Sequence, residues 1–115
     1  MSSFAKLESN SEFQKVYKGG KSRGNRDLVM YVLKDQSGPS RYGFSVSKKV
    51  GNSVQRHRVT RLLRESIRMC DSKVISGNRV VIIARPEIRG KGLNEVSRSV
   101  EHLLRAHRIW REPSE

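Results

Sequence analysis

The sequence is poor in cysteine and has no long apolar run. Its single cysteine, Cys70, excludes an intrachain disulfide and a cysteine-based metal cluster. We expect Cys70 to be a small buried core residue. No apolar stretch is long enough for a transmembrane helix, and residues 1–8 lack the charged start, apolar stretch and cleavage-like site of a secretion signal. The sequence therefore predicts a cytoplasmic protein without a membrane partner.

Acidic residues are also scarce. The 115 residues include 11 Asp and Glu against 24 Lys and Arg, for a formal charge of +13. Like charges repel one another, so this excess indicates a polyanionic partner. Nucleic acid is favoured because neutralising phosphates releases counterions, whereas a membrane surface would require an anchor or a long helix with a strongly apolar face. The length fits one RNA-binding domain over residues 1–115, with 1–8 and 109–115 as flexible tails.

The first half of the chain predicts a helix and two strands. Ser9 and Glu12 form a capping-box pattern, and Gly19-Gly20 suits a left-handed C-cap, which together predict a short helix. Residues 21–27 are polar and basic, so we expect a connection there. Apolar and alternating residues predict strands over 28–33 and 41–47, and we expect these two strands to pair as a hairpin.

The second half predicts a long helix, a buried strand and a last helix. Asn52 and Gln55 are a plausible cap for the long helix, which should end near Cys70. Residues 79–84 form a continuous apolar run suited to a strand buried on both faces, and residues 94–107 have helical spacing. The order is helix, two strands, helix, strand, helix, with room for an extra short strand. This order predicts an α+β two-layer sandwich with helices on a small mixed sheet.

The long helix separates an apolar face from a basic face. Helical geometry gathers Val59, Leu62, Leu63, Ser66, Ile67 and Cys70 on one side. The opposite side carries His57, Arg61, Arg64 and Arg68, flanked by Arg56 and Arg58. A solvated face is the alternative, but solvated faces usually mix both signs, and Glu65 is the only acid here. Lys48-Lys49 precedes a helix start whose free N–H groups favour phosphate. We expect this helix to contact RNA or DNA.

The run from Ser45 to Glu65 resembles the signature of the bacterial ribonuclease P protein subunit. That family has a Lys-Lys-x-Gly-Asn stretch leading into an Arg-Asn-Arg helix, and here Lys48, Lys49, Gly51 and Asn52 lead into Arg56-His57-Arg58. The similarity extends to residues 12–17, to the strand of Tyr31 and to residues 81–85. It implies a fold like domain 2 of ribosomal protein S5, with a left-handed βαβ crossover, although the general rule favours right-handed crossovers.

The resemblance also implies the function. The chain would be the protein subunit of a ribonucleoprotein endonuclease that removes the 5′ leader of precursor tRNA. Its catalytic centre would lie in the ribonuclease P RNA, which would bind most of the Mg²⁺, with one protein per RNA. The positions matching the family's basic motif imply contacts with the catalytic RNA by Lys48, Lys49, Asn52, Arg56, His57, Arg58, Arg61, Arg64 and Arg68. The family's leader-binding cleft corresponds to Phe13, Tyr17 and Tyr31, and a core role explains Phe13 equally well.

One position departs from the family pattern. His57 replaces the Asn of Arg-Asn-Arg, and a neutral imidazole lacks the paired donor and acceptor of an amide. We expect His57 to gain charge at mildly acid pH and so strengthen RNA binding.

Two rival functions remain open. A protein nuclease is disfavoured because His57, His102 and His107 lack a paired carboxylate in the sequence pattern. Composition alone does not exclude a general, ribosomal-type binder of structured RNA.

Overall fold

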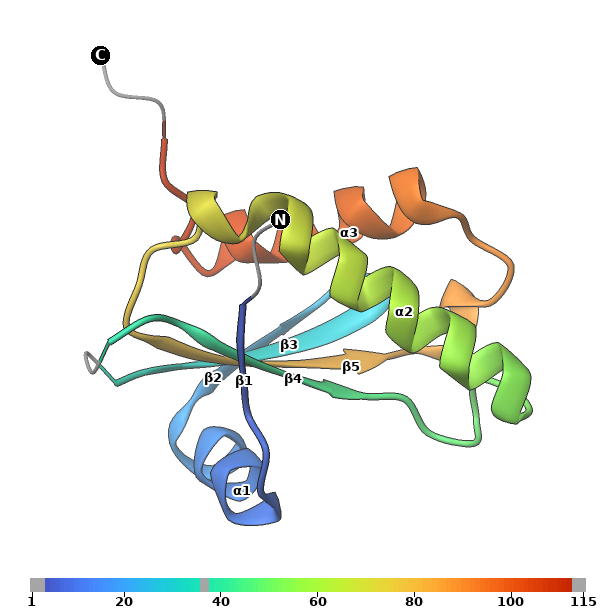
Figure 1. Ribbon diagram of the computed structural model, residues 1–115, viewed down its shortest axis with the longest axis horizontal. Coiled ribbons are helices and arrows are strands. Elements are labelled where there is room, and N and C mark those ends of the chain that lie inside the picture. Colours follow the sequence, from blue (N-terminus) through green and yellow to red (C-terminus); the bar gives the residue numbers. More distant parts are fainter. Residues whose placement is uncertain (1–3, 36–37, 113–115) are drawn as a thin grey trace.

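The computed structural model describes residues 4–35 and 38–112. Within these residues one five-stranded sheet carries α1 on one face and α2 and α3 on the other (Figure 1). The strands lie in the order β1-β4-β5-β3-β2. The elements are β1 (Ala5–Lys6), α1 (Asn10–Gly19), β2 (Lys21–Gly24), β3 (Leu28–Lys34), β4 (Arg41–Ser45), α2 (Ser53–Cys70), β5 (Asn78–Ala84) and α3 (Leu93–Ala106), with short 3₁₀ turns at Asp71–Lys73 and Pro86–Ile88. The predicted α+β fold with a mixed sheet is confirmed.

The predicted hairpin is wrong, because β5 lies between β3 and β4. It pairs antiparallel with β3 and parallel with β4, so Val81 lies opposite Tyr31 on one side and opposite Gly43 on the other. The physical reason is burial. Residues 80–82 of β5 are buried, and an apolar strand of this kind belongs in the centre of a sheet. Helix α2 is the crossover between the parallel strands β4 and β5.

Two further strands were not predicted as such. Strand β2 occupies residues expected to form a connection, and all four of its residues are exposed at the sheet edge. Strand β1 pairs parallel with β4 at the opposite edge. The predicted tail is therefore wrong for residues 4–8, since the ring of Phe4 packs edge-on against Tyr42 and Leu7 is buried.

The second predicted tail is wrong for residues 109–112. Ile109 is buried, and Trp110 forms a β-bridge with Val74. The guanidinium of Arg105 lies 4.9 Å from the centre of the Trp110 ring. Residues 1–3 and 113–115 lie outside the described residues.

The two sheet faces carry separate apolar clusters. Met30, Tyr42 and Ile82 are fully buried beneath α2 and α3. Cys70 is only partly buried and packs against this cluster, so the expected core role is met in part, and burial raises the pKa of its thiol to about 12. On the other face, α1 buries Val16 against Val81. None of the described helices is long and apolar enough to span a membrane.

Helix α1 begins as predicted but ends differently. Ser9 and Glu12 form the capping box. The C-cap residue Gly20 has an extended backbone (φ −89°) in place of the expected left-handed one. Glycine is required there by space, since an added Cβ would lie 2.7 Å from the Val16 carbonyl oxygen and 2.8 Å from that of Val32. The close approach turns the chain directly into β2.

Candidate nucleic-acid interface

Helix α2 starts at a fixed and positively charged turn. The Asn52 side-chain oxygen accepts a hydrogen bond from the Gln55 N–H at 2.9 Å, and the Gln55 side chain accepts one from the Asn52 N–H at 2.8 Å. A Cβ on Gly51 would lie 2.1 Å from Gln55 Oε1, so this capping box requires glycine before Asn52. The side-chain oxygen of Asn52 therefore already accepts a hydrogen bond from its own helix. The side-chain N–H₂ of this exposed residue can donate to an RNA oxygen.

The lysines that precede α2 lie on the same turn. Lys48 and Lys49 are exposed, whereas Val50 is fully buried and anchors the turn to the core. The Val50 N–H donates to the Ser47 carbonyl at 3.0 Å, and the Gly51 N–H donates to that of Lys48 at 3.2 Å. The first two helical residues have no intrahelical acceptor for their N–H groups. Two mobile cations thus flank backbone donors at the positive end of a helix.

The two faces of α2 are as the periodicity predicts. Val59, Leu63 and Ile67 are buried against the sheet and α3, and Ser66 is buried beside them. His57, Arg61 and Arg64 are exposed on the outer side. Among the described residues, none of these three forms an ion pair with a carboxylate. The outer side therefore presents positive charge that is free for a polyanion.

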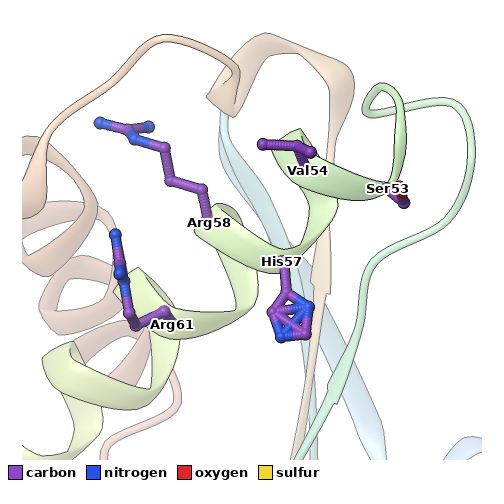
Figure 2. Close-up of a pocket in the computed structure, with 5 residues that line it drawn as sticks. All are labelled: Ser53, Val54, His57, Arg58 and Arg61. Carbon is purple, nitrogen blue, oxygen red and sulfur yellow. The ribbon is translucent and has the colours of Figure 1, made fainter.

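Two hollows flank the ridge formed by His57 and Arg61. One has a volume of about 470 Å³ and is lined by Ser53, Val54 and Arg58 together with the ridge. Figure 2 shows Arg58 and Arg61 extending on one side of α2 while His57 points away from them. The second hollow, of about 380 Å³, lies on the β4 side and is lined by Val46, Ser53, Arg56, His57, Thr60, Arg61 and Arg64. Sequence reasoning missed Val54, whose 76% exposure only the fold reveals.

Three of the predicted cations have additional constraints. Arg58 Nη1 donates to the carbonyl oxygen of Lys91 at 3.1 Å, which ties α2 to the loop before α3. Arg68 is paired with Glu65 on the same helix. Arg56 is half-buried, and its Nε is buried without a hydrogen-bond acceptor among the described residues. Arg61 and Arg64 are therefore the least constrained arginines of α2.

The predicted leader-binding aromatics lie together on the opposite face of the sheet. The rings of Tyr17 and Tyr31 meet edge-on with centroids 5.1 Å apart, and those of Phe13 and Tyr17 are 6.5 Å apart. All three side chains are half-buried. Burial raises the pKa of the Tyr17 hydroxyl, and a hydrogen bond with Ser45 partly opposes this effect. The ring of each tyrosine is thus packed against a neighbouring ring and still partly accessible to solvent.

Strand register extends this group into a row across the sheet. Ser45 pairs with Ile83, Ile83 with Val29, and Val29 with Gly24, which places all four on the face that α1 covers only in part. The first three are partly exposed and Gly24 is exposed. We call the aromatics and this row the aromatic surface: Phe13, Tyr17, Tyr31, Ser45, Ile83, Val29 and Gly24.

The basic and aromatic groups meet at the end of β4. Ser45 lies on the aromatic surface, whereas the next residue, Val46, packs on the other side of the sheet and lines the hollow beside α2. Consecutive residues of an extended chain point to opposite faces. One short segment therefore joins the two groups of side chains.

The remaining histidines have structural partners. His107 Nε2 lies 2.9 Å from the Met30 carbonyl oxygen, and His102 Nδ1 lies 3.2 Å from the Asn25 amide nitrogen. In the part of the chain that the structure describes, no three His, Cys, Asp or Glu side chains gather as a possible metal site. These histidines thus stand apart from the basic and aromatic groups.

Comparisons with known proteins agree with this geometry. The family model described as Ribonuclease P matches residues 1–108. The ribonuclease P protein component of Lachnoclostridium phytofermentans is 50% identical over 103 residues, which cover 90% of this chain and 89% of the relative. That of Alkaliphilus metalliredigens is 39% identical over 109 residues, covering 95% and 98%.

Solved structures give the same result. The RNase P protein of Staphylococcus aureus superposes with a TM-score of 0.84 at 31% identity, covering 91% of this chain and 96% of that chain. The protein from Thermotoga maritima gives 0.81 at 26% identity, covering 88% and 96%. The expected family and its role as a subunit of an RNA-processing ribonuclease are confirmed: the chain belongs to the ribonuclease P protein family.

Proposed function

We propose that the chain binds two RNAs through two adjoining surfaces and works in the cytoplasm. The α2 surface, formed by Lys48, Lys49, Asn52, Arg56, His57, Arg58, Arg61, Arg64 and Arg68, binds the catalytic RNA of ribonuclease P. The aromatic surface binds the single-stranded 5′ leader of precursor tRNA. Together they hold the leader beside the RNA that cleaves it, which gives the mature tRNA 5′ end.

The chemistry of each surface supports its ligand. Arginine forks match phosphate oxygens in pairs, and they lie along a rigid helix whose start is fixed by the capping box. Such a surface follows backbone shape more than base sequence. Tyrosine rings stack on unpaired bases of any identity, which suits leaders of varied sequence. The junction at Ser45 and Val46 carries the proposal, because the two surfaces adjoin there.

We place the catalytic centre in the RNA, with Mg²⁺ bound mainly by that RNA. A chain of charge +13 repels a divalent cation, whereas RNA phosphates attract one. Mg²⁺ also prefers oxygen ligands in octahedral geometry and commonly takes them from phosphates. The contribution of the protein is then to position the leader and to neutralise phosphates around the site. We propose one protein per RNA.

The two assignments are separable by mutation. Tyr31→Ala in the reconstituted ribonucleoprotein should weaken precursor tRNA binding by about 1–3 kcal/mol, the value of one base–ring stack, and leave mature tRNA unaffected. Arg64→Ala is the matched control, since it should weaken the interaction with the catalytic RNA whichever tRNA is present. If Tyr31→Ala weakens both tRNAs equally, the leader assignment is wrong.

A further inference from the structure

A second basic groove lies at the β2 edge of the sheet, on the opposite edge from β1. It runs between the edge strand β2 and helix α3 and has a volume of about 620 Å³. Its walls are Lys21, Ser22, Arg23 and Gly24 on one side and His102, Leu103 and Ala106 on the other. Strands β2 and β4 are separated by β3 and β5, so this groove is distinct from both hollows beside α2.

Strand register directs two cations into the groove. Lys21 lies opposite Val32 and Arg23 opposite Met30, and directly opposed residues share a sheet face. Val32 and Met30 are buried beneath the helices. Lys21 and Arg23 therefore extend on the same face, at the open edge, along the flank of α3. Both are exposed, and within the described residues neither forms an ion pair with a carboxylate.

The position of Arg23 beside α3 has independent support. The pKa of His107 is lowered mainly by burial, opposed by its hydrogen bond with the Met30 carbonyl, and lowered further by the charge of Arg23. His107 follows the last residue of α3. The guanidinium of Arg23 is thus close enough to the end of α3 for its charge to lower the pKa of the His107 imidazole.

His102 adds a fixed donor to the same groove. The side-chain oxygen of Asn25 accepts hydrogen bonds from the N–H groups of Asp27 and Leu28, at 3.0 and 2.9 Å. That orientation leaves the Asn25 amide N–H₂ to donate to His102 Nδ1 at 3.2 Å. A neutral imidazole that accepts at Nδ1 carries its proton at Nε2. Exposed His102 therefore offers an N–H, and the polar groups of Lys21, Arg23 and His102 are all donors.

The groove continues the aromatic surface around the sheet edge. The row that begins at Ser45 ends at Gly24, the neighbour of Arg23. Helix α1 runs beside this row, since Phe13 lies over β4 and Gly19 lies against Leu33 of β3. Neighbouring β-strands are about 4.8 Å apart. A single-stranded RNA that lies along this row from β4 crosses β5 and β3 before it reaches β2. There it meets the groove.

We propose that the groove between β2 and α3 binds the phosphodiester backbone of the distal 5′ leader, after the leader has crossed the aromatic surface. Lys21 and Arg23 pair with successive phosphates, and His102 Nε2 donates to a phosphate oxygen. This inference rests on the proposed function, because the aromatic surface must hold the leader first. It predicts that binding energy continues to grow with leader length beyond the segment that contacts Tyr31.

The test uses the reconstituted ribonucleoprotein and precursor tRNAs whose leaders lengthen by one nucleotide at a time. Dissociation constants are measured under conditions that prevent cleavage. The native protein should gain affinity in two stages, and the Lys21→Ala/Arg23→Ala variant should lose the second stage only. Two single-strand phosphate contacts add about 1.4 to the log–log salt slope, so the second stage should weaken about sevenfold over a fourfold rise in salt.

The matched control is Lys73→Ala/Arg111→Ala, which removes the same charge beside the Val74–Trp110 bridge and should retain both stages. Native-like binding of long leaders by the Lys21/Arg23 variant would overturn the proposal. So would an equal loss for mature tRNA, which would assign the groove to another RNA segment. Failure of the proposed function has a different result, because Tyr31→Ala would then leave the first stage intact.

A crosslinking measurement is independent of affinity. A photoreactive group on Ala106→Cys, in the α3 wall of the groove, should react with leader nucleotides further from the cleavage site than those that react from Val29→Cys on the aromatic surface. The reverse order, or reaction with the catalytic RNA alone, would contradict the path across the sheet edge. Both Ala106 and Val29 are partly exposed.

Discussion

The ring of Phe13 lies directly on Gly43 of β4. A Cβ added at Gly43 would lie 2.4 Å from Phe13 Cζ, a distance that folded proteins do not tolerate. The absence of a side chain at Gly43 therefore lets α1 approach the sheet and sets the position of Tyr17, one turn later on α1, against Tyr31. Phe13 acts in this arrangement as a packing anchor whose outer edge remains accessible.

Replacing Gly43 with alanine should destabilise the fold. The added methyl forces Phe13 off its site, and overpacking of this kind costs about 1–3 kcal/mol. Urea unfolding followed by circular dichroism measures the loss. Gly24→Ala is the matched control, because its Cβ would lie 3.5 Å from the nearest atom, the Leu28 carbonyl oxygen, in ordinary contact. Equal losses for the two variants would contradict the packing role of Gly43.

Local patterns predicted the helices well, and their failure for strand pairing has a physical cause. The capping boxes at Ser9 and Asn52 and the apolar spacing of α2 involve residues three or four apart, so sequence shows them directly. The pairing of β3 with β5 joins residues such as Tyr31 and Val81, which no local pattern links. Strand β2 escaped prediction because all its residues are exposed and carry no alternating pattern.

The candidate site divides in the same way. The cations of α2 follow from helical periodicity, which is a local property. The hydrogen bond from Arg58 to the Lys91 carbonyl and the contact of Phe13 with Gly43 depend on tertiary packing, and no sequence pattern indicates them. Exposed Val54 is ambiguous in sequence, because valine on a helix usually belongs to the core.

The arginines of α2 should contribute unequally to RNA binding. Arg64 is exposed and without an ion-pair partner in the described part of the chain, so Arg64→Ala should lower the log–log salt slope of binding to the catalytic RNA by about one. Arg68 already pairs with Glu65, so Arg68→Ala should change the slope less. Glu65→Gln should release Arg68 and raise the slope. Filter binding over a salt series measures all three, and equal slopes for the two arginine variants would refute the ranking.

Fold stability should decrease at mildly acid pH through His107. Burial lowers the pKa of this imidazole from its ordinary value of 6.5, so the unfolded chain binds a proton at a higher pH than the folded chain does. Between the two values the unfolded state holds more protons, and stability falls as the pH falls through that window. The full contribution of neutral His107 is present above pH 6.5.

The variant His107→Gln isolates this effect. A glutamine amide can still donate to the Met30 carbonyl, but it does not titrate, so the free energy of unfolding should depend less on pH in this range. Urea titrations at a series of pH values provide the comparison. A native-like pH dependence in the variant would assign the acid sensitivity to another group. Arg23→Ala should reduce the pH dependence of the unfolding free energy only slightly, since burial is the larger cause of the lowered His107 pKa.

His57 should make binding of the catalytic RNA sensitive to pH. Its exposed imidazole lines both hollows on α2, where its neighbours include Arg56, Arg58 and Arg61, and among the described residues no carboxylate lines either hollow. Protonation would add a positive charge facing phosphate, and histidine is the side chain whose ordinary charge change falls at physiological pH. Affinity measured from about pH 5.5 to 8 should therefore rise toward acid in the native protein and stay flatter in His57→Asn. Because the native protein and His57→Asn have the same arginines, the comparison isolates the imidazole. Superimposable pH curves would show that His57 carries no charge-dependent contact.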